Sequence, residues 1–216
     1  MNPSRLLASL TLLLSTAPLS ARTIELTDAD CTRMAVLAAE APRLWWAANE
    51  SSPGVFTTKY SLLLHSKKAF LICFPIDRIP RGQRITNAEL LVPVNSVEYG
   101  EQRLTIRRIL GDWGVGVCHD YRMVRPKKVE WAKPGARGVS SDCAGKATAT
   151  VRLSEVGSTA VNVTSDVELW YTGASANQGW IMMLEDADAR IHLLSPLSTY
   201  PNGRGSWKLR ITYEPE

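Results

Sequence analysis

The sequence lacks the residue spacings that mark most metal centres and hydrolase sites. No two of its four cysteines are close together, and His65, His119 and His192 are scattered, which disfavours a zinc site. No Gly-x-Ser-x-Gly motif occurs, so the turn that holds the nucleophile of an α/β-hydrolase is not predicted. Internal repeats and low-complexity linkers are also missing. We therefore expect one folded unit without a recognisable catalytic motif.

Long apolar runs are missing too, except for a short one near the N-terminus. Leu6–Leu14 is mostly apolar, follows Arg5 and precedes a stretch of small residues that contains Pro18. This run is too short to span a bilayer but is typical of a secretory signal peptide. We predict a signal peptide over 1–21 and a single domain over 22–216 that is secreted, extracellular or periplasmic, with no membrane span.

The four cysteines all follow the predicted signal peptide. They are Cys31, Cys73, Cys118 and Cys143. An even number in an exported chain favours two disulfides, for which three pairings exist. Cys118 and Cys143 flank an irregular, basic stretch with Gly and Pro, so we favour a bridge there, which would stabilise the fold by roughly 3 kcal/mol. Cys31 and Cys73 would then form the second bridge by elimination.

Positive charge is concentrated in one segment. The chain has a formal net charge of +4, or +3 after removal of Arg5 with the signal peptide. Residues 101–137 hold nine basic and four acidic side chains. Such a segment is usually a solvated face, but it also suits an anionic polymer. Export makes a polysaccharide a better candidate than nucleic acid for that polymer.

Apolar periodicity predicts mainly strands. Period-two alternation is clearest in Trp207–Tyr213, and in Phe70–Phe74 it places Phe70, Ile72 and Phe74 on one face and Leu71 and Cys73 on the other. Further strands are expected at Ser61–Leu64, Ala88–Val94, Leu104–Leu110, Thr148–Leu153 and Ile181–Leu184. Many strands with little helix predict an all-β, antiparallel sandwich.

Two segments carry helical signals. Ser165-Asp166-Val167-Glu168 has the form of a capping box, Trp170 and Tyr171 extend an apolar face, and Gly173 can end the helix. One short helix is predicted there. Residues 34–48 are rich in Ala and Leu, but Pro42 would break a helix, so extended structure is favoured over helix.

The stretch "LICFPIDRIPRGQRITNAELLV" (71–92) resembles the hallmark of the DNRLRE-type domain, a family of secreted β-sandwich modules. Its matching positions are Phe74, Ile76, Ile79, Pro80, Gly82, Ile85, Thr86, Ala88 and Leu90. "GDWGVG" (111–116), "VEW" (129–131), "VNVTSDVELWYTGASANQGWIMML" (161–184) and "GSWKLRITY" (205–213) resemble later parts of the same pattern. The likeness covers residues 60–213.

This resemblance implies a jelly-roll-like sandwich of two antiparallel sheets, in which 74–82 forms a corner between strands of one core. It also implies carbohydrate binding, because relatives are often attached to polysaccharide-active enzymes and some bind polysaccharide. The chain departs from the family at Cys73 and Pro75, where a charged residue and an acid are common. The segment around Cys118–Cys143 and residues 22–59 have no clear counterpart in the family.

The seven tryptophans offer the best indication of a binding surface. Trp170, Trp180 and Trp207 fall in periodic elements and are predicted core residues. Trp113 and Trp131 flank the basic segment, where exposed indoles could stack on sugar rings. Their alternative role is to pin the loop to the sandwich. The predicted ligand-binding set is Trp113, Trp131, Arg122, Arg125, Lys127 and Lys128.

The acidic side chains suggest weaker alternatives. Glu185, Asp186 and Asp188, followed by His192, suit a turn after a strand, but a pair of carboxylates also suits a glycosidase, and alternate oxygen ligands suit Ca²⁺. No cofactor other than this candidate Ca²⁺ is predicted. Asn49 and Asn162 begin glycosylation sequons, which have no meaning in a bacterial host.

Three functions remain open from the sequence. The first is a secreted, non-catalytic module that binds a polysaccharide or a cell-surface glycan, with an acidic polymer as the favoured ligand. The second is a structural or adhesive module with a protein partner. The third is a small polysaccharide-cleaving enzyme that uses Glu185 or Asp186.

Overall fold

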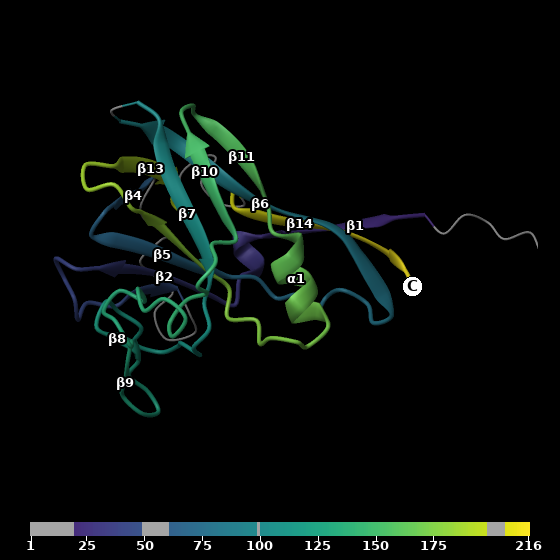
Figure 1. The fold of residues 1–216 in the computed structure, drawn as a ribbon, viewed down its shortest axis with the longest axis horizontal. Coiled ribbons are helices and arrows are strands. Elements are labelled where there is room, and N and C mark those ends of the chain that lie inside the picture. Colours follow the sequence, from purple (N-terminus) through teal and green to yellow (C-terminus); the bar gives the residue numbers. More distant parts are fainter. Residues whose placement is uncertain (1–19, 49–60, 99, 198–205) are drawn as a thin grey trace, which may run out of the picture.

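The computed structural model describes residues 20–48, 61–98, 100–197 and 206–216. Almost every element in these ranges is a β-strand (Figure 1). The strands are β1 (Arg22–Thr27), β2 (Arg33–Ala38), β3 (Trp46–Ala48), β4 (Ser61–His65), β5 (Lys68–Cys73), β6 (Gln83–Val97), β7 (Gln102–Arg108), β8 (Tyr121–Met123), β9 (Val129–Glu130), β10 (Ala149–Leu153), β11 (Gly157–Asn162), β12 (Trp180–Leu184), β13 (Arg190–Leu194) and β14 (Lys208–Pro215). A 3₁₀ turn (Asp28–Asp30) and one helix, α1 (Thr164–Tyr171), complete the described elements. Neither has the length or hydropathy of a membrane-spanning helix.

Two six-stranded antiparallel sheets form the body, as the sequence predicted. The first sheet has the order β1-β14-β6-β13-β4, and β11 pairs with β6 as well. The second sheet has the order β10-β7-β12-β5-β2-β3. Strand β6 organises the first sheet because its 15 residues pair with β14, β11 and β13 in turn. Strands β8 and β9 form a separate two-stranded hairpin.

The predicted faces of β5 are confirmed, and both are buried. Phe70, Ile72 and Phe74 point into the core between the sheets, which we call the first core. Leu71 and Cys73 point to the other side of the second sheet, into a separate apolar cluster that we call the second core. The predicted core tryptophans, Trp170, Trp180 and Trp207, all lie in the first core. The second sheet is therefore apolar on both faces.

Residues 74–82 form the corner that the sequence predicted. This segment leaves β5 in the second sheet and enters β6 in the first sheet. Ile76 and Ile79 are buried in the first core and close a turn, in which the Ile79 N–H donates to the Ile76 carbonyl over 3.1 Å. Gly82 has φ +72°, a conformation that glycine adopts without steric cost. The corner thus joins two sheets that share one core.

The predicted helix is present, but its N-terminus differs from the capping box. Helix α1 begins at Thr164, and its N-cap, Val163, makes no side-chain capping bond. Ser165 lies inside the first turn, and the Asp166 carboxylate is directed to Trp180 and Arg108 instead of to the helix backbone. The sequence pattern could not show these tertiary partners. Gly173, at φ +75°, follows the helix as predicted.

Residues 34–48 are extended, as favoured, and form β2, a turn and β3. Strands β1, β8, β9 and β13 were not predicted, and of β11 only its end near Asn162 was expected. Residues 1–19 of the predicted signal peptide lie outside the described residues. The sequon at Asn49 lies outside them as well. Asn162, in the second sequon, is exposed at the end of β11 and accepts a hydrogen bond from the Thr164 N–H.

Among the glycines in the described ranges, Gly179 is the one most constrained by its surroundings. It has φ +75°, and a Cβ there would lie 2.1 Å from the Ile72 carbonyl oxygen and 2.8 Å from the Cys73 Cα. Gly173 has the same φ but nothing within 4 Å of its Cβ position, which makes it a matched control. We expect Gly173→Ala to lower the free energy of unfolding by about 1–2 kcal/mol and Gly179→Ala by more than about 3 kcal/mol. Urea unfolding followed by tryptophan fluorescence measures both, and equal losses would contradict the backbone clash.

Candidate functional site

Residues 109–147, which we call the insert, cover the outer face of the second sheet. Side chains of the insert and of strands β2, β5 and β12 form the second core. Its members from the insert are Ile109, Trp113, Val117, Trp131, Ala136 and Cys143, and its members from the sheet include Ala35, Leu37, Ala69, Leu71, Ile181 and Met183. The insert is therefore packed onto the sheet over much of its length, although it contains little regular structure beyond the β8–β9 hairpin.

Trp113 and Trp131 are buried in the second core, which corrects the prediction that they stack on sugar. Their exposed fractions are 1% and 4%. The Trp113 indole N–H donates to the Gln178 carbonyl over 2.8 Å, and the Trp131 indole N–H donates to the Cys118 carbonyl over 2.9 Å. Arg33 also lies over the Trp113 ring, 4.7 Å from its centroid. Both indoles thus pin the insert to the sandwich, as the alternative interpretation proposed.

A buried carboxylate, that of Asp142, organises the segment that follows Trp131. Its two oxygens accept hydrogen bonds from the backbone N–H groups of Ala132, Lys133 and Gly138 over 2.8–2.9 Å. Asp142 is 4% exposed. A carboxylate can be buried when it is fully hydrogen-bonded, so the backbone supplies here the partners that a cation or water would supply elsewhere.

The four cysteines are free thiols, in contrast to the predicted disulfides Cys118–Cys143 and Cys31–Cys73. Cys31 packs against the first core and Cys73 belongs to the second core. The two thiols are neighbours without a bond between them: burial, and after it the nearby Cys73, raises the pKa of Cys31. Cys118 and Cys143 belong to the insert and are buried, and burial raises the pKa of both thiols. In this structure the indoles and Asp142 fasten the insert, and no bridge takes part.

The β8–β9 hairpin, residues 121–130, carries the exposed part of the predicted binding set. We call it the basic hairpin, and Figure 1 shows it projecting away from the two sheets. Arg125, Lys127 and Lys128 are exposed in its turn. The Lys128 ammonium lies 4.1 Å from the centroid of the Tyr121 ring, a cation–π contact that orients it. Three of the six predicted residues are thus brought together on the surface.

The Arg122 side chain is separated from these three residues because it points back toward Gly111, at the start of the insert. Its guanidinium packs so closely on Gly111 that a Cβ there would lie 2.5 Å from Nη1. Among the described residues, no carboxylate lies within 4 Å of a cationic atom of Arg122, Arg125, Lys127 or Lys128. The positive charge of the basic hairpin is therefore not neutralised by an ion pair within the described ranges.

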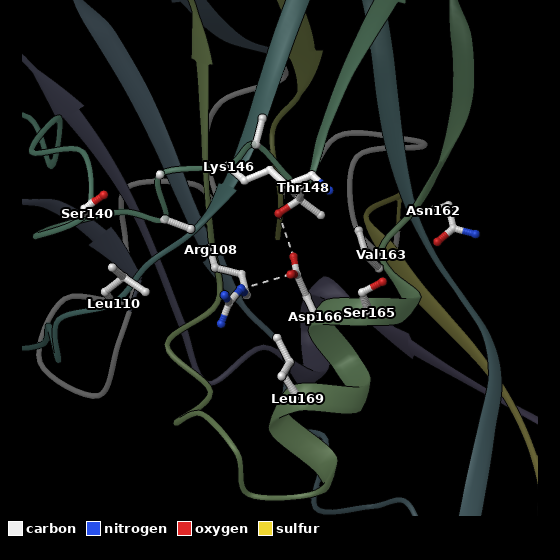
Figure 2. Close-up of a pocket in the computed structure, with 13 residues that line it drawn as sticks. Arg108, Leu110, Ser140, Lys146, Thr148, Asn162, Val163, Ser165, Asp166 and Leu169 are labelled. Carbon is white, nitrogen blue, oxygen red and sulfur yellow. Dashed lines mark hydrogen bonds and ion pairs between the residues drawn. The ribbon is translucent and has the colours of Figure 1, made fainter.

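A cavity of about 470 Å³ opens between the insert, the end of β7 and the start of α1 (Figure 2). Sequence reasoning did not identify it. The charged residues that line it are Arg108, Lys146 and Asp166. The polar residues that line it are Ser140, Thr148, Asn162 and Ser165. Leu110, Val163 and Leu169 supply apolar surface, and Leu110 is 40% exposed. The lining combines cations, hydroxyl groups and aliphatic side chains.

The Asp166 carboxylate is the fixed point of this cavity. Its Oδ2 accepts hydrogen bonds from the Thr148 hydroxyl over 2.6 Å and from the Trp180 indole N–H over 2.8 Å. Its Oδ1 lies 3.0 Å from Nε of Arg108, an ion pair drawn in Figure 2. Arg108 Nη1 donates to the Ser175 hydroxyl over 3.3 Å. The guanidinium is thereby held at the cavity wall, and its Nη2 makes no hydrogen bond to the described part of the chain.

Lys146 contributes a second cation to the same cavity. It is exposed and has no carboxylate within 4 Å in the described ranges. Because Asp166 offsets the charge of Arg108, Lys146 leaves the cavity with a positive excess. A ligand with hydroxyl groups and one negative charge would complement this lining.

The acidic residues after β12 form an exposed turn, one of the interpretations left open. Asp186 pairs with Arg103 over 2.9 Å, and Glu185 lies 3.8 Å from Arg107. Nowhere in the described ranges do three or more His, Cys, Asp or Glu side chains gather in a way that would hold a metal ion. The predicted alternative Ca²⁺ site therefore has no preformed ligand cluster there.

A serine, a histidine and a glutamate meet on the outer face of the first sheet. The Ser61 hydroxyl lies 3.3 Å from Nδ1 of His192, and Glu98 Oε1 lies 2.9 Å from Nε2. These are the residue types of a hydrolase triad. In such a triad, however, the serine contacts Nε2 of the histidine and the carboxylate contacts Nδ1, the reverse of the arrangement here. None of the three lines the cavity of Figure 2, and the contacts are those of neighbouring strands on a sheet surface. We attribute them to the surface of the sheet.

The comparisons with known proteins leave the family open. The chain matches none of the protein-family models, and no curated protein matches it closely. The similarity to DNRLRE-type domains therefore stays a prediction, whereas the two-sheet, antiparallel fold that it implied is observed.

Asp142 should control the order of the insert. Asp142→Asn leaves one acceptor oxygen for three N–H groups, and we expect a loss of at least about 2 kcal/mol in the free energy of unfolding together with faster amide exchange over 132–138. Asp112→Asn is the matched control, since Asp112 is 63% exposed and pairs only with Arg33. Its effect should stay within about 0.5 kcal/mol. Unchanged exchange over 132–138 in Asp142→Asn would contradict the proposed role.

The thiols give an independent test of the cysteine assignment. Protein denatured without reductant should react with Ellman's reagent at four thiols, and native protein should react slowly at Cys118 and Cys143 because both are buried with raised pKa values. A titration of only two thiols, or none, in the denatured protein would show that disulfides form.

Proposed function

We propose that this protein is an exported, non-catalytic β-sandwich module that binds an acidic polysaccharide through the basic hairpin and the adjoining surface of the insert. The observation that carries this proposal is the group of exposed cations, Arg125, Lys127 and Lys128, which have no carboxylate partner in the described ranges. Unpaired cations on a surface attract a polyanion at long range and bind it at short range.

The way the insert is fastened to the second sheet supports this use of charge. The basic hairpin stands on a base that is fastened by Trp113, Trp131 and Asp142, so its cations are presented from an ordered support. An ordered support reduces the entropy lost on binding. By contrast, most cations of the first sheet already form ion pairs within the protein, as Lys208 and Arg210 do with Glu25.

The cavity of Figure 2 supports a sugar ligand in particular. Its volume of about 470 Å³ falls within the range of small-molecule sites, which is roughly 300–1,000 Å³. Hydroxyl and amide groups can exchange hydrogen bonds with sugar hydroxyls, while Leu110 and Leu169 can cover the apolar face of a ring. With both indoles of the insert buried, aliphatic side chains and hydrogen bonds replace the ring stacking that the sequence suggested.

Affinity electrophoresis in gels that contain polygalacturonate, dextran sulfate or neutral dextran tests the proposal. We expect retardation by at least one acidic polymer and none by dextran. Combined replacement of Arg125, Lys127 and Lys128 by alanine should remove most of the retardation, and Lys146→Ala should weaken it less. Raising the ionic strength from about 0.01 M to about 0.15 M shortens the Debye length from about 30 Å to about 8 Å and should also weaken it.

The charge-matched control replaces three cations of the first sheet, Arg84, Lys208 and Arg210, which form ion pairs with glutamates. It has the same net charge as the hairpin variant and should keep wild-type retardation. An equal loss in the two triple variants would mean that only net charge matters, and the proposed site would be wrong. Wild-type protein that no acidic polymer retards would rule out the function itself.

A further inference from the structure

A second, smaller crevice lies between the insert and the outer face of the second sheet. It has a volume of about 230 Å³. Its charged lining consists of Arg107 of β7, Lys133 and Arg137 of the insert, and Glu185 after β12. Its wall also contains the buried Cys143 and Met183. We call it the anion crevice. Three cations and one carboxylate give it a clear positive excess.

The single carboxylate neutralises these cations only in part. Glu185 Oε1 lies 3.8 Å from Nη2 of Arg107, near the outer limit of an ion pair, and the Glu185 side chain is 57% exposed. Arg137 is half-buried and has no carboxylate within 4 Å in the described ranges. Burial lowers the pKa of Arg137, because removing a cation from water is unfavourable, and the charge of Glu185 offsets only part of this effect. A bound anion would offset that cost.

Backbone carbonyl groups hold both guanidinium groups in place. Arg107 Nη1 donates to the carbonyls of Ala144 (3.2 Å) and Gly145 (2.6 Å), and Arg137 Nη2 donates to the carbonyl of Ser66 over 2.7 Å. The Nε and Nη1 groups of Arg137 make no hydrogen bond to the described part of the chain. The crevice therefore offers N–H donors whose positions are already fixed.

We propose that the anion crevice binds a sulfate half-ester, and hence that the acidic polysaccharide is a sulfated one. This inference rests on the proposed function. The crevice is smaller than a typical pocket for a whole ligand and suits a head group better than a sugar ring. A sulfate ester presents three terminal oxygens, one for each of the three cations, whereas a carboxylate presents only two. Guanidinium groups bind such oxyanions through paired hydrogen bonds.

The position of the crevice also suits a chain that continues into the larger cavity. Val139 and Cys143 line the crevice, and their neighbours Ser140 and Ala144 line the cavity of Figure 2. Both sites thus border the same turn, residues 138–145. A sugar ring in the cavity and the sulfate group of an adjacent unit in the crevice would bind on the two sides of this turn.

Calorimetric titration with glucose 6-sulfate, glucuronic acid and glucose 6-phosphate tests the proposal on the full protein. Glucose 6-sulfate should bind more tightly than glucuronic acid, whose carboxylate presents only two terminal oxygens. Glucose 6-phosphate presents three, like the sulfate ester, so its affinity decides between the two esters. Arg137→Gln removes the charge and the guanidinium donors, and should weaken glucose 6-sulfate binding about tenfold or more. Glu185→Gln removes the only carboxylate of the crevice and should tighten that binding, a gain that damage to the fold would not produce.

Arg103→Gln is the matched control, because Arg103 lies on the same strand but is exposed and pairs with Asp186. It should leave the affinity for glucose 6-sulfate unchanged. Equal or tighter binding of glucuronic acid or glucose 6-phosphate would overturn the sulfate assignment. Should Arg137→Gln fail to fold, Lys133→Ala and Glu185→Gln decide the matter, since both side chains are exposed and their expected effects are opposite.

The proposed function and this inference fail in different ways. No residue of the basic hairpin lines the crevice, and Arg137 and Glu185 line the crevice but not the cavity of Figure 2, so the effects of Arg137→Gln and Glu185→Gln assign the glucose 6-sulfate affinity to the crevice. Retardation by polygalacturonate without binding of glucose 6-sulfate would overturn the crevice assignment and leave the function standing. Binding of glucose 6-sulfate without retardation by any polymer would overturn the polysaccharide function instead.

Discussion

The second sheet is apolar on both faces, and the rest of the structure depends on covering the outer one. One face of β5 supplies Phe70 and Ile72 to the first core, and the other supplies Leu71 to the second core. Burying apolar area stabilises a protein by roughly 25 cal/mol per Å², so an uncovered outer face would leave a large part of this stabilisation unused. The insert provides the cover, which explains why a segment with so little regular structure has its tryptophans inside.

Burial of the insert's apolar side chains leaves its charged residues on the outside. Where a carboxylate is buried, as at Asp142 and Asp166, N–H and hydroxyl groups surround it. The cations of the basic hairpin have no such partner in the described part of the chain. The same segment therefore serves the fold through its interior and, in our proposal, the ligand through its surface. A polyanion would bind to a support that the fold has already ordered.

Local patterns were sufficient for most strands of the two sheets and for the corner. Period-two alternation predicted the opposite faces of β5, and Pro80 with Gly82 marked a turn between two apolar runs. The capping-box pattern located the helix but gave Asp166 the wrong partner, because a carboxylate near a helix N-terminus can bond either to the backbone or to a distant side chain. Trp113 and Trp131 were ambiguous for a similar reason. Composition shows that an indole is present, but its exposure depends on which surface the insert covers.

The sequence by itself determined the β-sandwich and concentrated the positive charge in residues 101–137, since alternation and composition are properties of neighbouring residues. Only the tertiary structure decided which of these charges remain without an ion pair, which indoles are buried, and that Arg107, Lys133 and Arg137 meet at one crevice. Such meetings depend on contacts between residues far apart in the chain. They are fixed by the way the insert packs on the second sheet, where the second core excludes water and the surrounding backbone supplies the hydrogen bonds.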